Sequence, residues 1–156
     1  MASTFYSDQY YKPIPGTGAG GDLKVLVGSY TFASITIIND VVHMFTIPVG
    51  FTPLFGWLVG DDLDTGTEAL EIDVGVVGDT TKYLNSGVIT GDTIANEKIT
   101  VGIKIPLCED LMTVTPTKVT TEVDCIATIT AAANATGTGT ITVVLAGVYN
   151  DPRIVA

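Results

Sequence analysis

Strict alternation between apolar and polar residues limits most strongly what this chain can fold into. It runs through KITVGIKI at residues 98–105, TKVTTEVDCIATIT at 117–130 and GTITVVLAGVY at 139–149. Successive side chains of a strand point to opposite faces, so a period of two predicts strands buried on one side and solvated on the other. Antiparallel sheets accommodate such strands. The residues expected to share one core are Ile99, Val101, Ile103, Ile105, Val119, Val123, Ile141, Val143 and Leu145.

The same reasoning over the whole chain predicts eight strands, rich in Thr, Val and Ile and separated by turn-forming residues. Strands at this spacing predict an all-β fold: one antiparallel β-sandwich, jelly-roll-like, with a barrel as the other arrangement. DTTKYLNSG at 79–87 is the one stretch expected to form a helical turn, with Asp79 as its N-cap. The predicted strands cover residues 23–33, 41–49, 53–60, 69–77, 87–90, 98–106, 117–131 and 139–150.

The first 22 residues differ from the rest, because YSDQYYKPIPGTGAGG at 6–21 combines three tyrosines, two prolines and four glycines. Proline opposes helix and glycine opposes regular strand, so residues 1–22 are expected to form an arm that adds no strand. The sandwich domain is then 23–150, followed by a tail at 151–156. Aromatic side chains outside a core favour an interface. The predicted partner-binding residues are Phe5, Tyr6, Tyr10 and Tyr11.

Charge and hydropathy exclude several classes of function. The 156 residues carry a net charge of −10, and Arg153 is the single arginine, so the cation cluster that nucleic-acid binding needs is absent. No apolar run reaches the ~18 residues of a membrane span. The N-terminal sequence does not have the pattern of a secretory signal. These features predict a soluble protein made in the cytoplasm that binds neither nucleic acid nor membrane.

Six of the seventeen acidic residues lie in GDDLDTGTEALEIDVG at 60–75. The spacing does not fit an EF-hand loop, which needs acidic or amide ligands at its third position and Glu at its twelfth. The preferred interpretation is a solvated connection between two strands, with Glu71 and Asp73 on the wet face of the second. The alternative is a looser calcium site, whose candidate ligands are Asp61, Asp62, Asp64 and Glu68.

No residue pattern of a known catalytic or cofactor site is present. The chain lacks GxSxG, a Walker loop and HExxH, and its single histidine, His43, lies in the apolar stretch VVHMFTIPV. Cys108 and Cys125 sit in no CxxC, and they are expected to be free buried thiols unless their strands lie side by side. The sequence therefore predicts no catalytic residues, no cofactor and no enzymatic activity.

The stretch TIINDVVHMFTIPVGFTP and the later LVGDDLDTGTEALEIDVG resemble a family of tailed-bacteriophage virion proteins. The resemblance covers residues 22–150 and consists of a strand–turn–strand consensus rather than a catalytic signature. The matching parts are Ile47 to Gly50, Asp62 to Gly66, Leu70 to Gly75, Gly87 to Gly91 and Gly139 to Val143.

The resemblance implies a capsid decoration, or cement, protein: a small β-rich domain on the outer surface of the head, often a homotrimer. The implied partner is the major capsid protein, and no catalytic residues are carried over. A receptor- or glycan-binding head of a tail or fibre protein is the alternative, because fold alone does not separate the two roles. A hydrolase is the third class of function, and the sequence lacks the set of nucleophile and base that a hydrolase needs.

Overall fold

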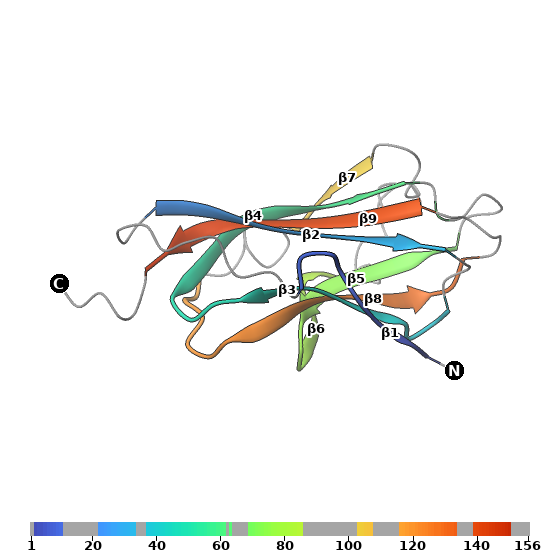
Figure 1. Ribbon diagram of the computed structural model, residues 1–156, viewed down its shortest axis with the longest axis horizontal. Helices are drawn as coiled ribbons and strands as arrows, with labels where there is room; N and C mark the ends of the chain where they lie inside the picture. Colours follow the sequence, from blue (N-terminus) through green and yellow to red (C-terminus); the bar gives the residue numbers. More distant parts are fainter. Residues whose placement is uncertain are drawn as a thin grey trace.

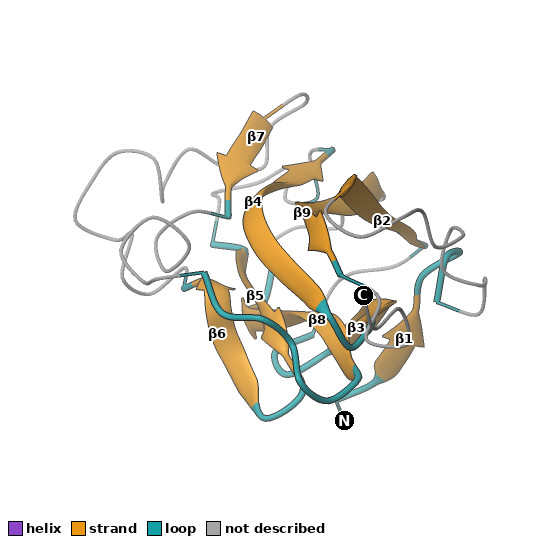
Figure 2. Ribbon diagram, turned by 90° about the vertical axis from the view of Figure 1, so that its left-hand side faces the viewer, coloured by secondary structure: helices purple, strands orange, loops and turns teal. Residues whose placement is uncertain are grey.

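The computed structural model describes residues 2–10, 22–33, 37–61, 63, 69–85, 103–107, 116–133 and 139–150. Within these residues the chain forms nine β-strands in two sheets that face each other (Figures 1 and 2). The predicted all-β sandwich is confirmed. Across the same described ranges, no helix has the length and apolar character needed to cross a membrane.

One sheet has five strands and the other has four. The five-stranded sheet has the order β1 (Thr4–Tyr6), β3 (Val41–Ile47), β8 (Val123–Ala131), β5 (Glu71–Val76) and β6 (Asp79–Leu84). The four-stranded sheet has the order β2 (Asp22–Phe32), β9 (Gly139–Tyr149), β4 (Phe51–Gly60) and β7 (Ile103–Pro106). All strand pairs are antiparallel except β1 with β3, which is parallel.

The core lies between the sheets, where the alternation predicted it. Ile141, Val143 and Leu145 of β9 are fully buried. They face a second buried row on β8, which consists of Cys125, Ala127 and Ile129. Val119 and Val123 are partly buried and pack against the same core. The predicted core residues Ile99 and Val101 lie outside the described residues, as do the side chains of Ile103 and Ile105.

Predicted strand boundaries agree with the structure for β2, β3, β4, β5 and β9 to within a few residues. The strand predicted over 117–131 begins only at Val123. Val119 instead exchanges backbone hydrogen bonds with Gly50 and Phe51 at the turn between β3 and β4, 2.8 Å each. The strand predicted at 87–90, and residues 98–102 of the next, lie outside the described residues.

The helical turn predicted at 79–87 is wrong, because Asp79–Leu84 forms β6 and pairs with β5 as a hairpin. Gly78, at a φ of 95°, supplies the left-handed conformation that a tight hairpin turn needs, and the β-branched Thr80 and Thr81 follow it. Asp79 therefore begins a strand and caps no helix.

Candidate functional site

The N-terminal segment is part of the sandwich, so the prediction that it adds no strand is wrong. Residues 4–6 form β1 at the edge of the five-stranded sheet, in register with Val41 to His43 of β3. Just before β1, the buried Asp40 carboxylate accepts a 2.8 Å hydrogen bond from the backbone N–H of Ser3. Sequence propensity missed this strand because three residues paired to one neighbour carry no alternation of their own.

After β1 the chain crosses from the five-stranded sheet to the four-stranded sheet. Ser7 is buried; its backbone N–H donates to His43 O at 2.7 Å, and its hydroxyl donates to Met44 O. Asp8 then pairs with Ser29 of β2, through its backbone N–H at 3.1 Å and its carboxylate at 3.2 Å. These contacts close the side of the sandwich between β3 and β2.

Phe5, the first predicted partner-binding residue, packs into the protein itself. Its ring lies 5.2 Å from Tyr30 and 6.1 Å from Phe32, both on β2, and it contacts the edge of the core. Aromatic pairs at these distances add to the stability gained from burial. Phe5 therefore links β1, in the five-stranded sheet, to β2, in the four-stranded sheet.

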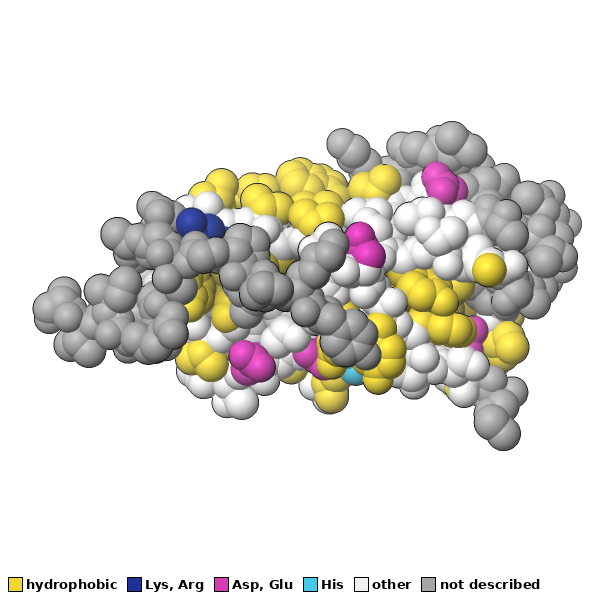
Figure 3. Space-filling view, in the orientation of Figure 1, with side chains coloured by type: hydrophobic (Ala, Val, Ile, Leu, Met, Phe, Trp, Pro, Cys, Tyr) yellow, Lys and Arg dark blue, Asp and Glu magenta, His cyan; other side chains and the backbone are white. Residues whose placement is uncertain are grey.

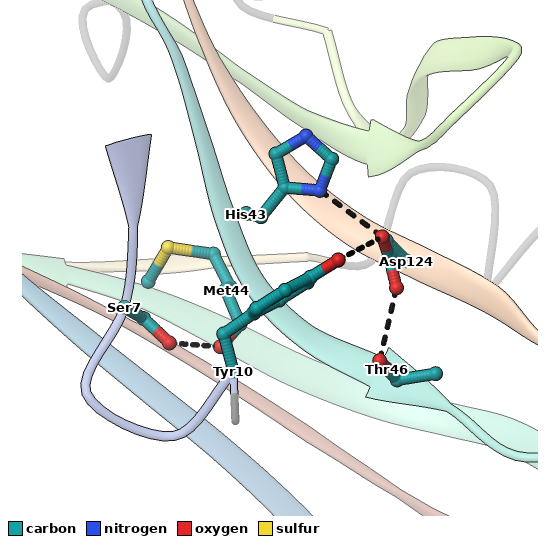
Figure 4. Close-up of polar contacts among 6 residues, drawn as sticks. All are labelled: Ser7, Tyr10, His43, Met44, Thr46 and Asp124. Carbon is teal, nitrogen blue, oxygen red and sulfur yellow. Dashed lines mark hydrogen bonds and ion pairs between the residues drawn. The ribbon is translucent and has the colours of Figure 1, made fainter. Parts of the chain in front are cut away.

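Asp124 is the centre of a polar cluster on the outer face of the five-stranded sheet (Figure 4). Its Oδ2 accepts hydrogen bonds from Tyr10 Oη at 2.9 Å and from His43 Nδ1 at 3.1 Å. Its Oδ1 accepts one from Thr46 Oγ1 at 2.9 Å. The register places Asp124 opposite Thr46, so the two strands bring these groups together, and Tyr10 reaches them from the N-terminal segment.

Three neighbouring rings at this position belong to Tyr6, Tyr10 and His43. We call these three residues the aromatic cluster. The Tyr6 ring lies 4.8 Å from Tyr10 and 5.0 Å from His43, and Tyr10 meets His43 edge-on at 5.4 Å. Tyr10 and His43 are partly buried, whereas Tyr6 is 43% exposed. Tyr6 and Tyr10 thus lie together at the surface, and Tyr11 lies outside the described residues.

The His43–Asp124 pair resembles half of a hydrolytic triad, so the available nucleophiles matter. In the part of the chain that the structure describes, no Ser or Cys side chain is bonded to His43. The Ser7 hydroxyl is bonded to a backbone carbonyl, and Cys125 is a free thiol that is completely buried. Burial raises the pKa of Cys125, which keeps it a thiol rather than a nucleophilic thiolate. The cluster can position rings and hydrogen-bond donors at a surface.

The acidic residues of the stretch at 60–75 differ in their exposure to solvent. Asp61 is exposed, and its carboxylate accepts a 2.8 Å hydrogen bond from the backbone N–H of Thr140, which joins the end of β4 to the start of β9. Asp73 is only 6% exposed, so its predicted place on a wet face is wrong. It lies on β5, which has β8 on one side and β6 on the other, and neighbours on both sides shield it.

The remaining candidate calcium ligands, Asp62, Asp64 and Glu68, lie outside the described residues. Within the described ranges, no group of three or more His, Cys, Asp or Glu side chains could hold a metal ion.

Sequence reasoning missed a second surface, on the outer face of the four-stranded sheet. There β2 presents Leu23, Val25 and Val27, which are 57%, 48% and 41% exposed. On β4, Phe55 and Trp57 are each 37% exposed, and their rings meet edge-on at 5.4 Å. The signal lay in the runs VLV at 25–27 and VVLAGV at 143–148, which have no polar residue at successive positions and so supply apolar side chains to both faces of a strand.

We call this surface the apolar face. Two rows of its side chains cross three strands. Ala146 of β9 lies between Val25 of β2 and Phe55 of β4, and Val144 of β9 lies between Val27 and Trp57. Figure 3 shows apolar side chains gathered along the top of the view, over the four-stranded sheet.

Comparison with known proteins places this fold among phage capsid chains. No protein-family model matches the chain, and no curated protein matches it. A chain of the cyanophage Pam1 capsid asymmetric unit is 25% identical, with a TM-score of 0.65 over 92% of this chain and 96% of that one. A chain of the Ralstonia phage GP4 capsid has a TM-score of 0.68 at 16% identity, over 95% and 99% of the two chains, which is a likeness of fold alone.

Proposed function

We propose that this protein is a non-enzymatic structural component of a bacteriophage virion, which decorates and stabilises the outer surface of the capsid. The observation that carries the proposal is the likeness to the Pam1 capsid chain, because it spans nearly the full length of both chains and retains sequence identity. The likeness to the Ralstonia phage GP4 capsid chain adds a second match of fold over nearly the whole sandwich.

The stable framework of the domain supports a mechanical role. Two sheets share one core, and the N-terminal segment is bonded to both sheets, which leaves a rigid block with well-defined outer faces. A protein that reinforces a shell needs rigid surfaces that bind neighbours, and it needs no reacting group. The acidic net charge of −10 keeps such a protein soluble before it joins the shell.

The proposed capsid-binding surface is the aromatic cluster and its surroundings, with the major capsid protein as the partner. Tyr6 offers a large exposed ring that Tyr10 and His43 hold in place, which limits the entropy lost on binding. Tyrosine is enriched among the residues that dominate interface energies. Tyr11, next along the chain, is proposed to extend this surface. The protein is further proposed to act as a homotrimer, since linked copies multiply weak contacts.

Co-sedimentation with purified heads that lack the protein tests this function. Wild-type protein should pellet with the heads to saturation, and Tyr6→Ser should lose at least ~10-fold in affinity, because an anchoring ring contributes ~2 kcal/mol or more. Thr31→Ser, on the opposite sheet, is the matched control and should bind as wild type does. Failure of the wild-type protein to bind heads would contradict decoration and favour a tail or fibre role.

A further inference from the structure

The apolar face has no charged residue at the outward positions of β2, β9 and β4; the register places one charged residue, Lys104 of β7, beside this face, opposite Val59 of β4. Along β2 the outward positions are Leu23, Val25, Val27, Ser29 and Thr31, and the outward positions of β9 and β4 that flank them are uncharged too. By contrast, the outer face of the five-stranded sheet carries the ionisable side chains of Asp124 and His43, which are partly exposed. The two sheets therefore present surfaces of opposite character.

The size of the apolar face is compatible with a contact surface. Its five most exposed side chains are Leu23, Val25, Val27, Phe55 and Trp57. Their exposed parts amount to roughly 400 Å², the size of the largest apolar patch on a typical monomer, which is often functional. That is about half of the ~800 Å² that each partner contributes to a standard interface.

A polar rim borders the apolar face at one end. Ser29 is bonded to Thr142 and Thr31 to Thr140, each pair through their hydroxyls at 2.8 Å. An apolar centre with aromatic residues and a rim of satisfied polar groups is the usual anatomy of an interface between protein copies.

From these observations we infer that the apolar face is where one copy of this chain meets another. Copies with a net charge of −10 repel one another, so a surface that brings no acidic groups together is favoured for close association. Among the outer sheet faces the structure describes, the apolar face meets that requirement, and it directs the acidic five-stranded sheet away from the contact. The inference rests on the proposed function, which it deepens by assigning the surface through which copies of this chain associate.

Sedimentation velocity over a concentration series tests the inference with the full chain. Wild type should sediment as an oligomer, and Val25→Lys should raise the dissociation constant at least ~100-fold, because association would bury an unpaired ammonium group. Thr31→Lys is the matched control: it lies on the same strand and face, adds the same charge, and sits in the polar rim. It should associate as wild type does.

Trp57 gives a second readout that does not depend on any variant. It is the only tryptophan in the chain and lies in the apolar face, so its emission should shift to the red and become more accessible to acrylamide as the wild-type protein is diluted. Far-UV circular dichroism, unchanged across the variants, verifies that each one is folded.

A wild-type protein that stays monomeric at all concentrations, or a Val25→Lys oligomer as tight as wild type, would overturn the inference. Its failure is separable from failure of the proposed function. A monomeric protein that still binds heads would contradict this inference but not the decoration role. An oligomer that forms through this face but does not bind heads would contradict the decoration role alone.

Discussion

Replacing Asp124 with alanine should cost about 2–4 kcal/mol of unfolding free energy. Its carboxylate accepts three hydrogen bonds, from Tyr10, His43 and Thr46. A bond to a charged acceptor contributes about 1.5–3 kcal/mol when well buried. The Asp124 side chain is 22% exposed, so water can satisfy part of what the alanine variant loses, and the total stays below the sum of three such bonds.

A double-mutant cycle isolates the share of this free energy that comes from the hydrogen bond between Tyr10 of the N-terminal segment and Asp124. Tyr10→Phe alone should cost about 1 kcal/mol, and in the Asp124→Ala background it should cost nearly nothing, because its acceptor has gone. Urea unfolding followed by circular dichroism, at one protein concentration throughout, gives each free energy by linear extrapolation.

Glu122→Ala is the matched control for this cycle. It removes an exposed carboxylate two residues earlier in the chain and should change stability by no more than ~0.5 kcal/mol. If Asp124→Ala behaved like this control, or if the two substitutions were simply additive, Asp124 would not be the residue that holds the segment in place.

Three further outcomes follow from the packing. Deleting residues 2–10 should lower the unfolding free energy by more than about 2 kcal/mol, measured by urea unfolding, because β1 and the partly buried ring of Phe5 leave the sandwich; an unchanged midpoint would contradict this. Gly28→Ala should cost about 1–3 kcal/mol in the same assay, since its methyl group would meet the backbone of β3, and a neutral result would mean that the two strands separate easily. In a Cys108→Ser background, Cys125 should react with a thiol reagent only as fast as the protein unfolds, because burial raises its pKa and blocks access; rapid labelling of native protein would refute its placement.

The sequence predicted the sandwich because alternation is a direct consequence of strand geometry. Val143 and Leu145 on β9, and Ala127 and Ile129 on β8, are buried where the period of two places them. Predictions that depended on local propensity alone were less reliable. Asp79 looked like a helix N-cap, yet Gly78 opens a hairpin there, and which of the two forms depends on the neighbouring β5.

The surfaces were harder to predict than the core. The composition of residues 1–22 indicated an arm, and only the fold brings Tyr10 to Asp124, which is 114 residues away in the chain. The period-two pattern does not reveal the apolar face, because alternation predicts one solvated face on every strand. On β2, Val25 and Val27 break that rule, and nothing in a single strand's sequence says which of its two apolar faces meets the core.

The number of copies of this protein per virion tests its proposed role most directly. Quantitative mass spectrometry of purified particles gives that number relative to the major capsid protein. A decoration protein should be present in a fixed, simple ratio to the major capsid protein and should be released from the particle surface before the shell itself comes apart. A few copies per particle, or none in purified virions, would contradict decoration of the capsid.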